Sequence, residues 1–225
     1  MAIALAEREP QDYTYLITPT GNELPEMMEH WSRLECILHK PLTRVSQDTL
    51  ASLIQIQNAL PNARMRWCTR ILKIEPCIRW MRSAGPAILY VGLRADEEER
   101  QGLYHEDIQC RYPMREWGWT EADVWEFLYK HDITIPYRTD CAWCYDQRLS
   151  QWRRLWQTHP DLYREAEAIE AKHGHTFRSP TRDHWPAALK ELRAQFEAGK
   201  IPRGSDDQLT LWESEQGGRC RICTL

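Results

Sequence analysis

The sequence of 225 residues contains no long apolar run. A helix that spans a bilayer needs roughly 20 consecutive apolar residues, and no stretch approaches that length. Residues 1–10, which end in Glu-Arg-Glu-Pro, also lack the pattern of a secretory signal peptide. We therefore expect a cytoplasmic protein that has no contact with a membrane.

The sequence also has no excess of basic residues. Lys and Arg together number 29 and Asp and Glu 33, which gives a formal net charge of −4. This balance excludes indiscriminate nucleic-acid binding, although it is compatible with a local basic patch. No internal repeat or low-complexity tract is present. With 42% hydrophobic and 28% charged residues, the composition is that of a soluble globular protein with one sizeable domain, or one domain with a small appendage.

Cysteine and tryptophan are plentiful by contrast, with 8 and 11 copies. Without an export signal, the cysteines do not fit a disulfide framework, and reduced thiols, metal ligands or catalytic thiols fit better. Most of the tryptophans are expected in the core, because large aromatic side chains bury much area.

Strand and helix patterns alternate through residues 1–140. The clearest strand is Ala87–Val91, a continuous apolar run as in a strand that is buried on both faces. Thr120 is expected to cap a helix that carries Val124 and Leu128. The alternation predicts an α/β fold in which a parallel sheet is covered by helices on both faces.

Strand patterns stop after Cys141. Helical patterns dominate from there to about residue 199, and a polar stretch then leads to a second group of cysteines. The sequence therefore predicts an α/β domain over residues 1–140 and a helical, cysteine-containing region over residues 141–225.

Two Cys-x-x-Cys pairs, Cys141/Cys144 and Cys220/Cys223, carry the clearest chemical pattern. Two residues between cysteines allow both sulfurs to reach one metal ion. Their separation exceeds the spacing of a compact zinc ribbon, and unpaired neighbouring thiols are the structural alternative. A redox pair is less favoured, because neither pair follows a thioredoxin-like strand. Thiolate ligands suit either zinc or an iron–sulfur cluster.

Cys68 lies in a basic segment. If this segment is helical, Arg66, Arg70 and Lys73 share one face at positions i, i+4 and i+7. Three cations beside a thiol suit a phosphate or sulfate group and lower the thiol pKa. The alternative is a solvated basic face with a core cysteine, and the composition does not decide between the two.

The loop that follows the clearest strand is a candidate ligand site. In open α/β sheets, ligands bind beyond the carboxyl ends of the strands. Gly92 permits close backbone approach, and Arg94 and Arg100 can hold an anion. The alternative interpretation is an acidic, solvated loop.

Five segments between about Thr18 and Cys144 resemble, in the right order, the motifs of the phosphoadenylyl-sulfate (PAPS) reductase family. They are Thr20-Gly21-Asn22-Glu23-Leu24-Pro25-Glu26, Cys68-Thr69-Arg70…Lys73…Pro76, Gly92-x-Arg94-x-x-Glu97-x-x-Arg100, Tyr112-Pro113-Met114…Trp117…Asp123-Val124-Trp125 and Ile135-Pro136-Tyr137. Each motif alone is modest, but five in order are specific. The sequence is thus similar to PAPS reductases and to their relatives among the ATP-pyrophosphatases, the adenine nucleotide alpha hydrolase-like proteins.

The resemblance implies a Rossmann-like sheet that binds an adenine nucleotide, either PAPS or ATP. It places these residues around the nucleotide: Thr20, Gly21, Arg70, Lys73, Gly92, Arg94 and Arg100. It also implies a four-iron (4Fe-4S) cluster, with zinc as the alternative, on Cys141, Cys144, Cys220 and Cys223. Cys68 is either a substitute ligand or the catalytic, sulfur-handling thiol.

Two features of the family are missing. The phosphate loop Ser-Gly-Gly-x-Asp-Ser is absent, and Met1–Arg8 resembles the second half of the helix that follows that loop. We therefore expect Met1 to be an internal methionine of a longer protein. The C-terminal Glu-Cys-Gly-x-His motif, which supplies the reductase nucleophile, is replaced by Cys220-Arg-Ile-Cys223, and this argues against sulfite-releasing reductase activity.

Three hypotheses about function follow. In the first, the chain is an enzyme of sulfur metabolism that reduces a sulfonucleotide or transfers sulfur at the expense of ATP. A sulfur donor or reductant protein is then its partner, and tRNA or DNA is a candidate acceptor. In the second, it is a non-catalytic, metal-stabilised module that binds nucleic acid or a partner protein through Trp152, Arg153, Arg154 and Trp156. In the third, it is an inactive fragment without the first strand.

Overall fold

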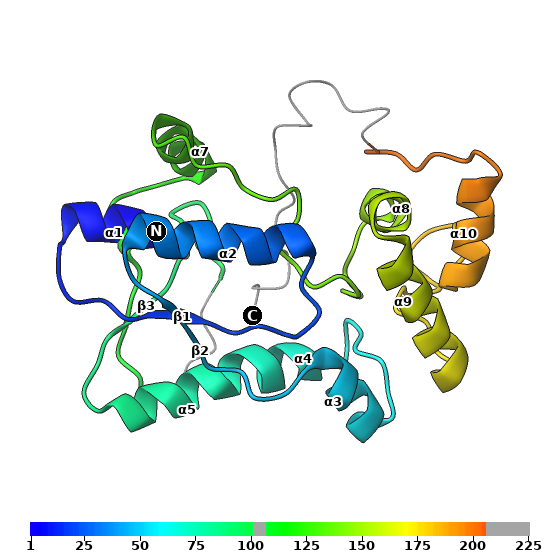
Figure 1. The fold of residues 1–225 in the computed structure, drawn as a ribbon, viewed down its shortest axis with the longest axis horizontal. Coiled ribbons are helices and arrows are strands. Elements are labelled where there is room, and N and C mark those ends of the chain that lie inside the picture. The colour runs from blue at the N-terminus through cyan, green and yellow to red at the C-terminus, as the bar shows by residue number, and fades with distance from the viewer. Residues whose placement is uncertain (101–106, 206–225) are drawn as a thin grey trace.

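The computed structural model describes residues 1–100 and 107–205 (Figure 1). The first part of the chain mixes helices and strands, and the helices that follow residue 148 stand beside it, on the right of Figure 1. No helix within these ranges combines the length and the apolar character needed to cross a membrane.

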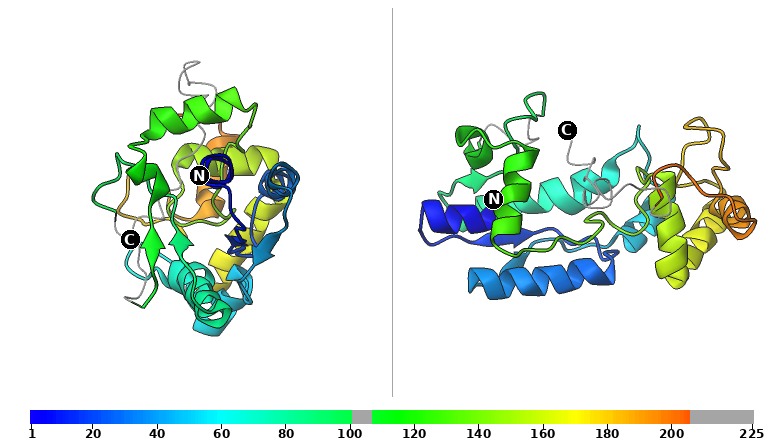
Figure 2. Two further views of the ribbon diagram at one scale, coloured as in Figure 1. Left: turned by 90° about the vertical axis from the view of Figure 1, so that its left-hand side faces the viewer. Right: turned by 90° about the horizontal axis from the view of Figure 1, so that it is seen from above.

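Short strands form two separate parallel pairs in the described residues. β1 (Tyr15–Ile17) pairs with β2 (Leu42–Arg44), and β3 (Leu89–Tyr90) pairs with β4 (Cys110–Arg111). The parallel pairing agrees with the predicted α/β class. The predicted continuous sheet, however, is divided into two pairs, which stand apart in the left view of Figure 2.

Helices lie on both sides of the strands. α2 (Pro25–Leu38) lies on one side of β1 and β2, and α5 (Glu75–Ala84) lies on the other (Figures 1 and 2). The remaining helices of this part are α1 (Ala2–Arg8), α3 (Leu50–Gln57), α4 (Trp67–Thr69), α6 (Pro113–Glu116) and α7 (Glu121–Lys130). The segment η1 (Arg70–Ile74) is a π-helix that joins α4 to α5.

Local sequence explains where two of these helices begin. The Thr120 hydroxyl donates to Asp123 Oδ2 at 2.6 Å, and the Thr120 backbone N–H donates to the same oxygen at 2.7 Å. This capping box confirms the predicted start of α7. α2 begins with Pro25, whose fixed φ and missing N–H suit the first turn of a helix.

After residue 140, the described elements are all helical. They are α8 (Leu149–Thr158), α9 (Pro160–His173) and α10 (Leu189–Glu197). The Tyr163 hydroxyl donates to the backbone carbonyl of Leu189 at 2.9 Å and so joins α9 to α10.

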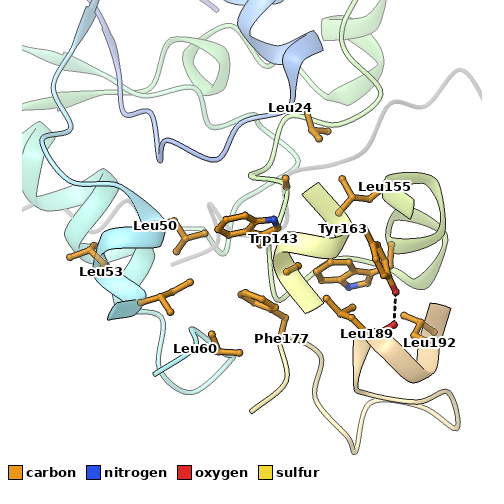
Figure 3. Packing of buried hydrophobic residues seen from close by; sticks show 14 of the residues in the cluster. Leu24, Leu50, Leu53, Leu60, Trp143, Leu155, Tyr163, Phe177, Leu189 and Leu192 are labelled. Atoms are coloured by element: carbon orange, nitrogen blue, oxygen red, sulfur yellow. Dashed lines mark hydrogen bonds between the residues drawn. The ribbon is translucent and has the colours of Figure 1, made fainter. Parts of the chain in front are cut away.

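The main core lies where these helices meet α3 and the loop around Trp143 (Figure 3). Trp152 and Tyr163 are 0% exposed, and Leu50 of α3 is 1% exposed in the same cluster. This core joins residues from both sides of position 140. The predicted boundary between two domains at that position stays a prediction.

The strands contribute less to the core than the sequence predicted. Ile88 is 39% exposed, and Leu89, Tyr90 and Val91 are half-buried. The prediction that Ala87–Val91 is buried on both faces is therefore wrong for the described residues. The reason is that β3 has a neighbouring strand on one side only.

Candidate anion and cysteine site

A large cavity of about 1590 Å³ runs along β1 and β3 and includes the carboxyl ends of both strands. Thr18, which follows β1, and several residues that follow β3 line it. Four of the predicted nucleotide-binding residues are in its wall, namely Lys73, Gly92, Arg94 and Arg100. The other three, Thr20, Gly21 and Arg70, are not in the wall. One part of the cavity therefore lies where an open α/β sheet binds ligands.

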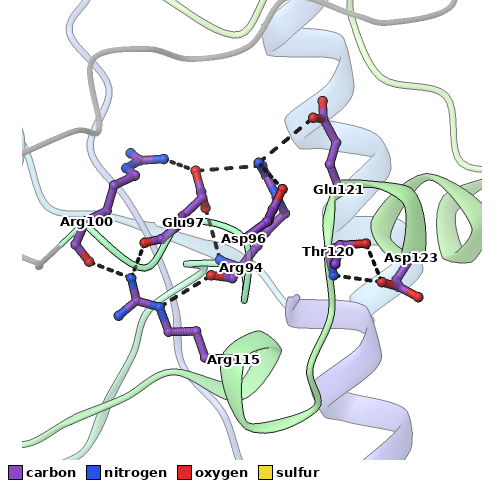
Figure 4. A network of polar contacts seen from close by, with 8 residues as sticks. All are labelled: Arg94, Asp96, Glu97, Arg100, Arg115, Thr120, Glu121 and Asp123. Carbon is purple, nitrogen blue, oxygen red and sulfur yellow. Dashed lines mark hydrogen bonds and ion pairs between the residues drawn. The ribbon is translucent and has the colours of Figure 1, made fainter.

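Carboxylates hold the arginines of the loop after β3 in place (Figure 4). Arg94 Nε donates to Asp96 Oδ1 at 2.8 Å, and the Arg94 backbone N–H donates to Glu97 Oε2 at 3.0 Å. Arg100 forms an ion pair with the same Glu97. The hydrogen bond from Arg94 lowers the pKa of Asp96. Glu97 Oε1 also lies 3.7 Å from Arg94 Nη1, so Glu97 stands between two guanidinium groups beside the cavity.

Arg115 holds the same loop from another side (Figure 4). Its guanidinium donates to the backbone carbonyl of Arg94 at 3.3 Å, to that of Arg100 at 2.6 Å, and to that of Glu97. The fork of N–H donors allows one arginine to serve several carbonyls. Sequence reasoning missed Arg115, because nothing in its local pattern separates it from a surface arginine.

Arg100 has hydrogen-bond donors that residues 1–100 and 107–205 leave without an acceptor. Its Nε and Nη2 atoms are buried, and neither has a hydrogen-bond partner among the described residues. Buried N–H groups of a charged side chain need acceptors. Since Arg100 lines the cavity, an oxyanion such as phosphate or sulfate would supply them.

The π-helix η1 decides which basic residue reaches the cavity. Thr69, Lys73 and Cys77, spaced four residues apart, all line it. Arg70 extends into solvent instead, where its 63% exposed side chain pairs with Glu75 at 2.6 Å. Because the π turn is wider than an α turn, Arg70 and Lys73 do not form the predicted common face.

Thr20 and Gly21 form the turn after β1 and hold it against α3. The Thr20 hydroxyl donates to Glu23 Oε1 at 2.7 Å, and the Thr20 carbonyl accepts from the Leu50 N–H at 2.7 Å. Gly21 has a φ of +70°, and a Cβ at this position would lie 2.6 Å from Thr49 Cγ2. The turn and this close approach both require glycine.

Asn22 connects this turn to the Cys141/Cys144 pair. Its backbone carbonyl accepts from the Ala142 N–H at 2.7 Å, and its side-chain Oδ1 accepts from the Trp143 N–H at 2.9 Å. The two residues between the cysteines are therefore both hydrogen-bonded to Asn22. Sequence reasoning did not assign this role to Asn22, because the partners lie far along the chain.

The described cysteines Cys68, Cys141 and Cys144 influence one another. A hydrogen bond from the Cys144 thiol lowers the pKa of Cys141, and the same bond, together with burial, raises the pKa of Cys144. Burial raises the pKa of Cys68, and the neighbouring Cys141 adds to the rise. Of the two interpretations that the sequence left open, the direction of this shift agrees with a core cysteine rather than with a thiol whose pKa is lowered by cations, because burial outweighs the nearby Lys73.

The predicted metal site depends on residues that the structure does not describe. Within residues 1–100 and 107–205, no group of three or more His, Cys, Asp or Glu side chains is arranged to hold a metal ion. Cys220 and Cys223, the second half of the predicted ligand set, lie outside these ranges. The described cysteines therefore do not fit a metal or cluster on their own.

Comparison with known proteins gives one family match and one curated relative. The family model of the phosphoadenosine phosphosulfate reductase domain matches residues 1–137, which is more than half of the chain. An uncharacterized protein of Methanocaldococcus jannaschii is 22% identical over 162 residues, which cover 63% of this chain and 39% of that relative. The chain thus spans well under half of the length of the relative. No solved structure matches the chain.

Proposed function

Because the chain belongs to the phosphoadenosine phosphosulfate reductase domain family, we propose that it binds an adenine nucleotide, either PAPS or ATP. The phosphate or sulfate groups would lie at the carboxyl ends of β1 and β3. The observation that carries the proposal is the pair of buried Arg100 atoms, Nε and Nη2, that lack acceptors among the described residues. Lys73 and Arg94 line the same cavity, and so do Asp12, Glu97, Glu121 and Asp146, so the support for an anion comes from the buried donors of Arg100 and not from the net charge of the wall.

The proposed chemistry belongs to sulfur metabolism. The nucleotide is either a sulfonucleotide that is reduced or ATP that activates an acceptor for sulfur transfer, and tRNA or DNA is the proposed acceptor in the second case. Cys68 is the proposed sulfur-handling thiol because it lies beside Cys141; it is not itself in the wall of the cavity, which its neighbour Thr69 lines. Its raised pKa keeps this group a thiol rather than a thiolate in the free protein. A reductant or sulfur-donor protein is the proposed partner.

The alternative, a module that binds nucleic acid through its C-terminal helices, has less support. Trp152 is 0% exposed, and the ring of Trp156 packs against Phe196 with centroids 5.7 Å apart. Arg154 lies over the ring of Tyr137, 3.7 Å from its centroid. The protein therefore uses in its own packing three of the side chains that such a surface would offer.

Calorimetric titration of the chain with ATP and with PAPS tests the proposal. Arg100→Gln should weaken the binding of one nucleotide about 10- to 100-fold, because it removes the charge and the buried donors. The matched control is Arg82→Gln, which removes an arginine that pairs with Asp107 at 2.9 Å and does not line the cavity. The affinity of the Arg82→Gln variant for the nucleotide should equal that of the unchanged chain. Failure of the unchanged chain to bind either nucleotide, or an equal loss in both variants, would contradict the proposal.

A further inference from the structure

The basic residues of the chain are distributed unevenly. Residues 36–95 contain nine Lys and Arg residues and two acidic residues, Asp48 and Glu75. The rest of the chain contains 20 basic and 31 acidic residues, so a strongly positive segment is part of a chain whose net charge is −4. A charge asymmetry of this kind indicates a surface that meets a negatively charged partner.

Much of this positive charge lies along the continuous helical segment that α4, η1 and α5 form. Four arginines of this region make up what we call the arginine strip, namely Arg64, Arg66, Arg70 and Arg79. The Arg70 N–H donates to the Arg66 carbonyl at 3.4 Å, one helical turn earlier. Arg70 also contacts Glu75 at 2.6 Å, and Glu75 is four positions before Arg79 on α5. Because residues four apart share one side of a helix, the strip follows one side of the segment.

The strip is open to solvent. Arg64, Arg70 and Arg79 are exposed, and Arg66 is half-buried. Cys77, at another position of α5, lines the cavity instead. α5 lies at the lower border of the molecule in Figure 1. One side of this helix therefore lines the cavity, and another side is accessible to a large partner.

Two further basic residues of the segment have other positions. Lys73 lines the cavity. Arg82 donates to both carboxylate oxygens of Asp107, at 2.9 and 3.1 Å. Neither residue therefore belongs to the arginine strip.

The protein itself compensates little of the charge of the strip. Within residues 1–100 and 107–205, Arg64 and Arg79 form no ion pair. Arg70 is paired with Glu75, but both side chains are exposed, at 63% and 43%, and an exposed ion pair contributes little to stability. A phosphate group can therefore take the place of Glu75 beside Arg70.

We infer that the arginine strip binds the phosphate backbone of a nucleic acid, either RNA or DNA. From Arg66 to Arg79 the strip extends over roughly 20 Å, at about 1.5 Å per residue. One strand of a duplex carries a phosphate for about every 3.4 Å of its axis, so several phosphates in a row can reach the strip. A guanidinium group binds a phosphate through two parallel N–H donors. A backbone of constant charge also fits a strip of one sign better than a protein surface on which both signs are interspersed.

The strip passes the proposed sulfur-handling thiol. Cys68 is half-buried and lies between Arg66 and Arg70 in the sequence. A nucleic acid bound along the strip would therefore lie beside this thiol. The inference rests on the proposed function in one respect, the nucleic-acid acceptor, and it assigns the surface that holds this acceptor.

Fluorescence anisotropy tests the inference with two labelled probes, an RNA hairpin of about 20 nucleotides and a DNA duplex of about 20 base pairs. Binding is measured without ATP and PAPS, so its outcome is separate from that of the nucleotide titration. The affinity should fall as the salt concentration rises from about 50 to about 200 mM. For the duplex, the slope of log affinity against log salt should be roughly −3 to −4, since about four phosphates are neutralised.

Two variants should change the affinity in opposite directions. Arg79→Gln should weaken binding about three- to tenfold and reduce the salt slope by about 1. Glu75→Gln should strengthen binding about threefold, because it frees Arg70 and removes a carboxylate that repels phosphate. Loss of folding does not produce a tighter complex, so Glu75→Gln separates binding from stability. The matched control is Arg164→Gln on α9, outside the strip, where the side chain is 69% exposed, and it should bind as the unchanged chain does.

Three outcomes would overturn the inference. One is absence of binding to both probes at low salt. The second is an equal loss of affinity in Arg79→Gln and Arg164→Gln. The third is equal affinity for polyglutamate, which would identify an acidic protein as the partner. Binding of a probe through the strip, together with a failed nucleotide titration, would support the inference and contradict the proposed nucleotide binding alone.

Discussion

The side-chain oxygen of Asn22 accepts a hydrogen bond of 2.9 Å from the backbone N–H of Trp143, which lies 121 positions further along the chain. A second bond, from the Ala142 N–H to the Asn22 carbonyl, lies beside it. The position of the Cys141/Cys144 pair is therefore set from the turn after β1.

Asn22→Ala should lower the free energy of unfolding by about 1–3 kcal/mol, because it leaves the buried N–H of Trp143 without an acceptor. Urea denaturation measures this loss. Asn62→Ala is the matched control, since the Asn62 side chain accepts bonds from the N–H groups of Arg64 and Met65 at an exposed site. Its loss should be smaller, and equal losses in the two variants would show that Asn22 has no special role.

Gly21→Ala should destabilise the protein by about 2–4 kcal/mol. The substitution places a Cβ at a φ of +70° and within 2.6 Å of Thr49 Cγ2. Gly174→Ala separates the two causes, because Gly174 has a φ of +64° in the left-handed helical region with nothing within 4 Å of the added Cβ. The control should cost about 1 kcal/mol, from backbone strain alone. Thermal or urea unfolding checks both, and a control as destabilising as Gly21→Ala would refute the role of the close approach.

Stability should fall as the pH rises from about 4.5 to about 7, because of Glu170. This carboxyl is 6% exposed and accepts from the N–H groups of Phe177 at 2.8 Å and Leu189 at 2.7 Å. Burial raises the pKa of Glu170 to about 7, whereas an unfolded glutamate titrates near 4.5. The folded protein therefore holds a proton that the unfolded chain releases, and raising the pH through this window favours unfolding.

Urea denaturation at several pH values measures the Glu170 contribution. Glu170→Gln removes the titrating group and should flatten this part of the profile. Glu165→Gln, on the exposed side of the same helix, should leave it unchanged. A profile that is equally steep in both variants would assign the pH dependence to other groups.

Metal analysis tests the predicted cluster on Cys141, Cys144, Cys220 and Cys223. After anaerobic purification, we expect iron with matching acid-labile sulfide, and we expect Cys141→Ala and Cys220→Ala each to lose both. Cys36→Ala, at an exposed cysteine, is the control and should keep them. Zinc without sulfide would indicate a structural site, and absence of any metal would exclude the ligand set.

The sequence predicted those features that depend on neighbouring residues. The start of α7 follows from the capping box between Thr120 and Asp123, which are three positions apart. The closeness of Cys141 and Cys144 follows from their spacing in the sequence. Parallel pairing was also predictable, because strands that alternate with helices leave few other arrangements.

Other features depend on parts of the chain that no local pattern connects. The partners of Asn22 lie far away in sequence. Ala87–Val91 would be buried on both faces only if β3 had a second neighbouring strand. An apolar run does not show whether that neighbour is present, and among the described residues β3 pairs with β4 alone. The outward direction of Arg70 depends on a π turn, which has no distinctive residue pattern.

The π turn also sets the alignment of the long helical segment that contains it. Each residue of an α-helix turns the chain by about 100°. A π turn holds about one more residue than an α turn, and this changes which side chains face in the same direction before and after it. It keeps Thr69, Lys73 and Cys77 in line along the cavity wall. If η1 became an ordinary α-helix with all its residues kept, α5 would rotate by about 100° relative to Thr69, and Trp80 and Met81 would turn away from the cavity wall that they now line. Deletion of a single residue from η1 would remove the wide turn and the extra residue together and would leave the alignment of α5 as it is.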